Sequence, residues 1–332
     1  MMWGLLKAIV RGTHGKAWTR SHDQRRSKQF AFVPMTLPTA LPDVRSRMVP
    51  LSELADHYDG LLCDVWGVLH NGVAAFDGAA EALCEYRAQG GRVVLITNAP
   101  RPSREIYPQL ERFGVPREAF DSIVTSGDVT SVLLAERPDA PLYHFGPARD
   151  RSILVGLKNP MVGVAEAKLC LLTGPLDDTI ETVDVYDNTL VEMRDNALEM
   201  ICANPDLTVR SGSRTVICAG SIAQRYAMLG GKVVFAGKPE MPIYDEALKR
   251  IYDSAGRIMP NSRILAVGDG IPTDIQGAAQ KGIDAYFVAS GVHANEFGCI
   301  DTEAKASETV KVIENRCVGI SLVGICDHLR WI

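Results

Sequence analysis

The chain lacks the residue patterns that mark several large classes of protein. Its eight cysteines form no CxxC pair and no Cys/His spacing of the kind that zinc sites use. No apolar run approaches the roughly 20 residues that span a bilayer. No basic stripe interleaved with aromatic residues marks a surface for nucleic acid, and the formal net charge is -5. We therefore expect reduced thiols, no membrane partner and no nucleic-acid partner.

Acidic residues are almost missing from the start of the chain. In residues 1–28, seven Lys and Arg residues stand against a single acid, Asp23. We interpret residues 1–47 as an N-terminal extension outside the fold: a disordered tail, the product of an upstream start codon, or an organellar transit peptide. We expect a cytoplasmic protein, with a mitochondrial or plastid location as the alternative if the extension is a transit peptide.

What the sequence does contain, from about Pro50 onward, is a regular alternation of short apolar runs and amphipathic stretches. This pattern predicts βαβ units, and hence a doubly wound, Rossmann-like α/β domain with a parallel sheet. The pattern changes between residues 148 and 230, which we interpret as an inserted αβ segment. The core then comprises residues 48–147 and 231–332. For the core we expect the strands GLLCD, GRVVLITNAP, SIVTSGD, KVVFAGKP, RILAVGDG and IDAYFVASG, and for the insertion AKLCLLTG, EMICANPD and RTVICAG.

Polar residues follow several of the core strands at the point where each strand ends. Ligands of open parallel sheets bind beyond the carboxyl ends of the strands, where loops and helix N-termini converge. The residues found there are Asp64, Thr97, Asn98, Lys238, Asp269 and Asp274. A set of carboxylates, one hydroxyl and one amine at strand ends predicts a single polar site.

Several carboxylates around one point repel each other unless a cation lies among them. Mg²⁺ fits, because it prefers oxygen ligands and shares a phosphate oxygen with its substrate. The candidate ligands are the side chains of Asp64 and Asp269 and the backbone carbonyl of Trp66, with Asp274 orienting a ligand or a metal-bound water.

The remaining residues suit phosphoryl transfer. Lys238 would neutralise a phosphoryl group, while the Thr97 hydroxyl and the backbone N–H of Asn98 would donate hydrogen bonds to its oxygens. Asp64 would attack phosphorus and form an aspartyl-phosphate that water then hydrolyses. The expected ligand is a small phosphorylated metabolite.

Four segments, DVWGVLHNG, VLITNAP, AGKPEMPIY and VGDGIPTDIQGA, resemble in this order the four motifs of the haloacid dehalogenase-like (HAD) hydrolases, specifically the class IIA phosphatases related to nitrophenylphosphatases. The resemblance covers about Pro50 to Gly291. It implies a parallel-sheet core, and it implies that the insertion is a cap that selects the substrate. Asn204 and Asp206, in the segment ANPD, then become substrate-contact candidates, and a homo-oligomer formed through the cap is a further expectation.

Trp66 departs from the motif of most phosphatases in this superfamily, where an aspartate at its position protonates the leaving group and then activates water. An indole can do neither. Class IIA relatives that carry this tryptophan form a recognisable subgroup. His70, a cap residue or metal-bound water would have to take the role; His70 is also a substrate-contact candidate, although packing in its loop is the simpler interpretation.

Trp66 leaves other functions open. One is a regulatory protein that binds a phospho-ligand through a degenerate site; another is a halide-displacing hydrolase, which the late acidic pair disfavours because carbon chemistry needs no metal. A signalling receiver domain would place its acidic pair before the phosphoacceptor, which is the reverse of the order here. A dinucleotide-binding domain is disfavoured because no GxGxxG follows the first strand.

Overall fold

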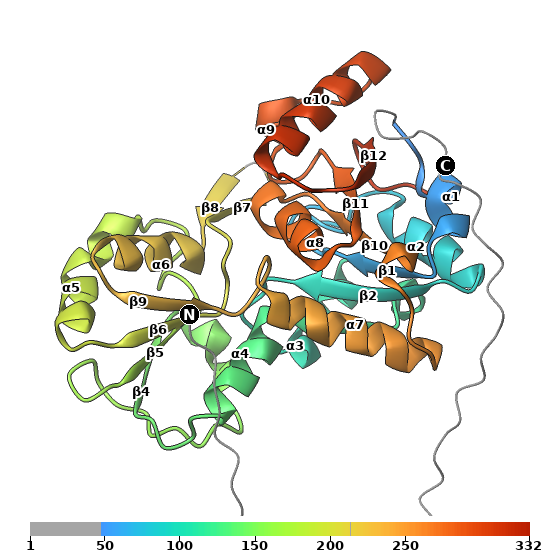
Figure 1. Ribbon diagram of the computed structural model, residues 1–332. Helices are drawn as coiled ribbons and strands as arrows, with labels where there is room; N and C mark the ends of the chain where they lie inside the picture. Colours follow the sequence, from blue (N-terminus) through green and yellow to red (C-terminus); the bar gives the residue numbers. More distant parts are fainter. Residues whose placement is uncertain (1–47, 213) are drawn as a thin grey trace, which may run out of the picture. The chain divides into compact units, whose positions relative to one another are not determined.

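The computed structural model describes residues 48–212 and 214–332. The proposed N-terminal extension, residues 1–47, lies outside the described residues. Within the described part, two parallel sheets with flanking helices make up most of the fold, and Figure 1 shows them side by side. The fold is thus the predicted α/β arrangement.

The first sheet carries the predicted core. Its strands are all parallel and, among the described residues, six in number, in the spatial order β12-β11-β10-β1-β2-β3. In chain order they are β1 Gly60–Cys63, β2 Arg92–Thr97, β3 Ser122–Thr125, β10 Ile264–Gly268, β11 Asp284–Val288 and β12 Leu322–Cys326. Since β1 lies between β10 and β2, the residues that follow these three strands share one stretch of the sheet edge.

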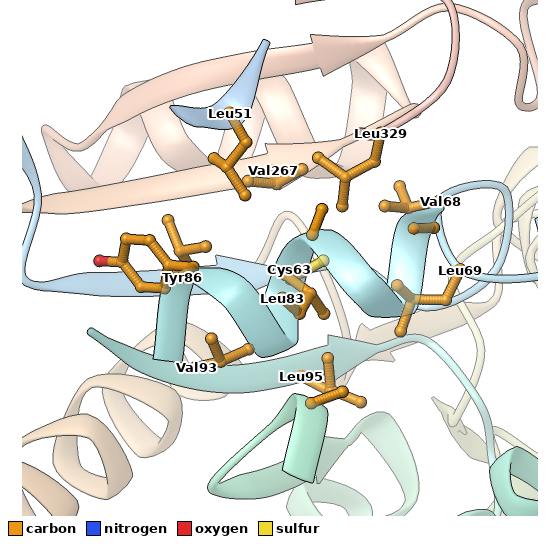
Figure 2. Close-up of a cluster of buried hydrophobic side chains, with 14 of the residues drawn as sticks. Leu51, Cys63, Val68, Leu69, Leu83, Tyr86, Val93, Leu95, Val267 and Leu329 are labelled. Carbon is orange, nitrogen blue, oxygen red and sulfur yellow. The ribbon is translucent and has the colours of Figure 1, made fainter. Parts of the chain in front are cut away.

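Both faces of this sheet are covered by helices, which explains the unbroken apolar strands. Successive residues point to opposite faces: Leu61 and Cys63 of β1 join one hydrophobic cluster, and Leu62 joins the other. Figure 2 shows the first cluster, in which Leu83 and Tyr86 of helix α2 (Ala79–Ala88) pack over the strands. Helix α7 (Met241–Ala255) covers the second face.

The second sheet has the parallel order β4-β5-β6-β9, with the strands β4 Leu142–Phe145, β5 Leu169–Leu172, β6 Glu199–Cys202 and β9 Lys232–Phe235. A separate antiparallel hairpin joins β7 (Thr208–Ser211) to β8 (Arg214–Ile217). We refer to the part of the chain from β4 to β9 as the cap and to the part around the first sheet as the core.

Three strands differ from the sequence-based expectation, and the first is β4, whose residues were assigned to the core but which pairs with β5 of the cap. The segment KVVF was expected in the core, but as β9 it pairs with β6 of the cap. The segment RTVI was expected beside the other strands of the insertion, but as β8 it pairs with β7 alone, outside the four-stranded sheet. Apolar composition identifies a buried strand, but it does not specify which sheet that strand joins.

The remaining helices connect and cover the two sheets. They are α1 Leu51–Leu54, α3 Ser103–Arg112, α4 Ser126–Ala135, α5 Asp187–Asp195, α6 Ala219–Met228, α8 Gln276–Lys281, α9 Ala294–Phe297 and α10 Glu303–Arg316. None of the helices in residues 48–212 and 214–332 combines the length and the apolar character needed to cross a membrane.

Candidate active site

Three buried carboxylates meet at the carboxyl edge of the first sheet. Asp64 directly follows β1, and Asp269 directly follows β10, its parallel neighbour. Asp274 lies in the short π-helical turn Ile271–Ile275. One oxygen from each of the three carboxylates lies within 4.8 Å of the other two. The three side chains therefore surround a single point.

Two glycines allow Asp274 to fold back toward the strand. Its backbone N–H donates to the Gly270 carbonyl at 2.8 Å, and its Oδ2 accepts from the Gly270 N–H at 3.0 Å. A Cβ on Gly268 would lie 2.3 Å from the Asp274 side chain. The segment GDGIPTD therefore specifies a tight turn whose carboxylate returns to the end of β10.

Lys238 is buried within this carboxylate cluster. Its Nζ donates to Oδ1 of Asp64 and, at 2.7 Å, to Oδ1 of Asp274. Only 2% of the residue is exposed, so the ammonium group is removed from water and stabilised by two carboxylates. Although Lys238 follows β9, a strand of the cap sheet, its amine reaches the end of β1 in the core.

The charges in the cluster do not balance, because three carboxylates face one ammonium. Burial alone lowers the pKa of Lys238, but Asp274 and Asp64 outweigh burial and hold that pKa well above its usual value. Burial and the neighbouring Asp274 raise the pKa of Asp64 well above its usual value, and they raise the pKa of Asp269 to about 7. Without a further cation, the cluster tends to bind a proton.

Thr97 and Asn98 stand beside the cluster at the end of β2. The Thr97 Oγ1 accepts from the Ala99 N–H at 3.2 Å. The Asn98 Oδ1 accepts from the Lys238 backbone N–H at 2.7 Å, and its Nδ2 donates to Oδ1 of Asp206 at 2.8 Å. Asn98 therefore connects the loop of Lys238 to the cap residue Asp206.

The indole of Trp66 contacts the cap. Its Nε1 donates to the backbone carbonyl of Arg210, in β7, at 2.7 Å. Next to it, the N–H of Gly212 donates to the Asn71 carbonyl at 3.1 Å. Gly72 packs so closely on the ring that a Cβ there would lie 2.5 Å from it. The tryptophan therefore joins the loop after β1 to the cap hairpin; ligation of a metal by its backbone carbonyl stays a prediction.

His70 is a packing residue of the same loop. It is 2% exposed, its Nδ1 accepts from the Gly72 N–H at 3.0 Å, and its ring lies 4.7 Å from that of Phe113. Burial lowers its pKa to about 4. His70 and Asn204 both line a second cavity, of about 310 Å³, whereas the cavity that contains Asp64 is lined by neither.

The cavity around the carboxylates has a volume of about 500 Å³ and lies between core and cap. The core contributes Asp64, Thr97, Asn98, Lys238, Asp269 and Asp274, and the cap contributes Pro205, Asp206, Leu207, Thr208, Val209 and Arg210. A polar floor with a largely apolar wall suits a small molecule that has one charged end.

Two cavity residues with charged or ionisable side chains were not found from the sequence. Arg210 lies in β7, and His293 lies in the loop after β11. Neither stands at the end of a core strand, and the residues around them carry no motif. Their proximity to Asp64 arises from how the cap hairpin and that loop fold over the sheet edge.

Two further glycines leave room for the side chain of Asp269. A Cβ on Gly67 would lie 2.0 Å from Oδ2 of Asp269, and a Cβ on Gly291 would lie 1.8 Å from the same atom. Gly67 moreover has φ +89°, a conformation that residues with a Cβ rarely adopt. Both positions therefore require glycine for Asp269 to reach the cluster.

We expect Gly291→Ala to displace the Asp269 carboxylate and to weaken divalent-metal binding by about 10- to 100-fold, the range found when the surroundings of a metal ligand are disturbed. Calorimetric titration of the purified variant with Mg²⁺ measures this change. Gly163→Ala is the matched control, because Gly163 is exposed and a Cβ there meets only the end of the Glu166 side chain. Equal metal affinity in the two variants would contradict the expected role of Gly291.

Two family models match the chain. One, described as haloacid dehalogenase-like hydrolase, matches residues 61–158. The other, described as HAD-hydrolase-like, matches residues 235–313. Together they contain every candidate residue except Asn204 and Asp206, and both of those exceptions lie in the cap.

Individual relatives agree with these matches. A haloacid dehalogenase-like hydrolase from Brucella suis, whose crystal structure is known, is 44% identical in sequence to this chain. The two structures superpose with a TM-score of 0.72 over 74% of this chain and 90% of that one. A 5′-nucleotidase of Bacillus subtilis is 25% identical over 74% of this chain and 93% of its own. An acid sugar phosphatase of Staphylococcus saprophyticus is 26% identical over 72% of this chain and 90% of its own.

Proposed function

The chain belongs to the haloacid dehalogenase-like hydrolases, and on that basis we propose that it is a Mg²⁺-dependent hydrolase of small phosphomonoesters. The observation that carries the proposal is the hydrogen bond of Lys238 to both Asp64 and Asp274 in a cavity between core and cap. A nucleophilic carboxylate, a buried cation and a second acidic pair meet there. Relatives named as sugar phosphatases and a 5′-nucleotidase support a phosphate ester as substrate.

The carboxylate cluster fits a magnesium ion. The donors of Asp64, Asp269 and Asp274 are all hard oxygens, and they converge within 4.8 Å. Burial and the neighbouring Asp274 raise the pKa of Asp269 to about 7, and a bound cation would offset the negative charge. When bound, Mg²⁺ would neutralise this charge and polarise a phosphoryl oxygen.

The chain's own residues would act in sequence. Asp64 would attack phosphorus with its free carboxylate oxygen, forming an aspartyl-phosphate that water later hydrolyses. Lys238 would neutralise the phosphoryl group, and the Thr97 hydroxyl and the Asn98 N–H would donate to its oxygens. Because Trp66 supplies no proton at the usual position, turnover would be slow or would depend on the leaving group.

A second candidate function is phospho-ligand binding with a regulatory role. The observation that favours it is Trp66, whose indole hydrogen-bonds to the cap instead of offering an acid or a base. Under this proposal the cavity would still bind a phosphate group beside Lys238. The chemistry would be too slow to matter.

An assay with 4-nitrophenyl phosphate and a titration of Mg²⁺ separates the two. We expect release of nitrophenol that requires the metal, with a lower half-saturating Mg²⁺ concentration at pH 8 than at pH 6. The sign follows from Asp269, which must lose its proton to bind a cation and whose pKa is about 7. A well-folded protein that binds inorganic phosphate but hydrolyses no ester of a broad panel would instead support the regulatory role.

A further inference from the structure

The proposed hydrolysis needs a proton donor for the leaving group, and Trp66 cannot be that donor. Among the described residues, seven with acidic or basic side chains line the cavity: Asp64, Asp206, Arg210, Lys238, Asp269, Asp274 and His293. Four of them belong to the carboxylate cluster or bind to it. Arginine does not titrate in a protein. The choice therefore falls between His293 and Asp206.

His293 has both ring nitrogens engaged on its own side of the cavity. Its Nε2 accepts from the Ile271 N–H at 3.3 Å, and its Nδ1 lies 2.9 Å from Oε2 of Glu296. Both ring nitrogens of His293 therefore already have a partner within the protein, and neither is free for a substrate. His70, considered from the sequence, lines only the second cavity.

Asp206 is placed differently, because it enters the cavity from the cap. One carboxylate oxygen, Oδ1, accepts from Asn98 Nδ2 at 2.8 Å, and Asn98 in turn binds the backbone of Lys238. The carboxyl group is thereby held next to the proposed phosphate-binding residues. Burial raises the pKa of Asp206 and outweighs the opposing effects of Lys238 and of the Asn98 hydrogen bond, which favours a carboxyl group that carries a proton to donate.

The position of Asp206 also suits the geometry of phosphoryl transfer. Attacking and leaving oxygens lie roughly in line on opposite sides of phosphorus. Asp64 attacks from the core, so the leaving group must point toward the cap. Asp206 lies in the cap segment of residues 205–210, and this segment lines the cavity.

We propose that Asp206 is the general acid and base of this enzyme, supplied by the cap in place of the side chain that Trp66 replaces. The proposal rests on the proposed phosphatase function. In the first step the bond from Asp64 to phosphorus forms, the bond from phosphorus to the ester oxygen breaks, and that oxygen takes the proton of Asp206. In the second step water attacks phosphorus, gives its proton back to Asp206 and releases phosphate from Asp64.

The test compares wild type and Asp206→Asn on two aryl esters of similar size. Phenyl phosphate has a poor leaving group and 2,4-dinitrophenyl phosphate a good one. We expect kcat/KM to fall about 100-fold on phenyl phosphate and only a few-fold on the dinitrophenyl ester, because a good leaving group departs without a proton. Since water activation is also lost, the variant should release a burst of about one dinitrophenol per active site while phosphorylated Asp64 accumulates.

Asparagine keeps the size of the side chain and still accepts from Asn98, and thermal unfolding checks that the variant folds. If it does not fold, Asp206→Ser tests the same prediction. Asp195→Asn, which alters an exposed carboxylate of the cap, is the matched control and should behave as wild type on both esters.

Two results would overturn the inference. Equal losses on the two esters without a burst would show that Asp206 binds substrate or supports the cavity and transfers no proton. A wild type that releases no dinitrophenol would refute the proposed function itself, and the inference with it. Failure of the inference alone is therefore recognised by an active wild type.

Discussion

Asp64→Asn is expected to lower kcat on aryl phosphates by at least about 10³-fold while the protein stays folded, because removing a covalent nucleophile typically lowers the rate by this much. An amide does not attack phosphorus, but its oxygen can still accept the hydrogen bond that Lys238 donates to Asp64. Because burial and Asp274 raise the pKa of Asp64, the charged carboxylate costs stability. The variant should therefore unfold at the same or a higher temperature than wild type at pH 8.

Steady-state hydrolysis of 4-nitrophenyl phosphate together with thermal unfolding measures both effects. The matched control is Asp59→Asn, just before the amino end of β1, where the carboxylate binds Arg257 and Arg263. That change is expected to cost stability and to leave kcat intact. Substantial turnover by a pure Asp64→Asn sample would contradict the aspartyl-phosphate mechanism.

Lys238→Met is expected to remove activity and, in metal-free protein at pH 8, to cost about 3–5 kcal/mol of stability, the usual effect of leaving buried charges without their partner. The pKa values of Asp64 and Asp269 are raised in the fold. Protonated carboxyls therefore stabilise the folded state fully below the unfolded pKa, near 4. That stabilisation is lost as the pH rises through the folded pKa, about 7 for Asp269.

The loss in Lys238→Met should accordingly be largest at pH 8, smaller near pH 5, and partly reversed by Mg²⁺, which supplies the missing positive charge. Urea unfolding at the two pH values, with and without the metal, measures it. Lys281→Met is the control: this lysine pairs with the exposed Asp245, so its removal should cost under about 1 kcal/mol. Equal losses in both variants would mean that Lys238 does not balance the charge of the cluster.

The sequence predicted the residues around the carboxylate cluster because they follow a simple rule of parallel sheets. Thr97 is the last residue of β2, and Asp64 and Asp269 directly follow β1 and β10. These three strands are neighbours in the core sheet. Lys238 was found by the same rule for a reason that proved wrong, since β9 belongs to the cap. Asp274 depends on the turn around Gly268 and Gly270, which its motif encodes.

What the sequence did not predict are contacts between segments that are distant in the chain. The indole of Trp66 and Arg210, 144 positions apart, meet only because the hairpin β7–β8 folds onto the loop after β1. Strand β12 was missed as well, although it is fully buried at one end of the core sheet. Local periodicity carries no information about which distant partner a segment will meet.

The contacts of Trp66 also bear on how readily the cavity admits a molecule. A cap that opened for a substrate would have to break, among other contacts, the hydrogen bond from Trp66 to Arg210 and the hydrogen bond from Gly212 to Asn71. Two such bonds have a net worth of about 1–3 kcal/mol. That energy favours the closed form by roughly 5- to 150-fold, and it weakens by the same factor the apparent affinity for any ligand that binds through the open form. The hydrogen bond of Trp66 to the cap thus raises the ligand concentration at which the cavity becomes half occupied.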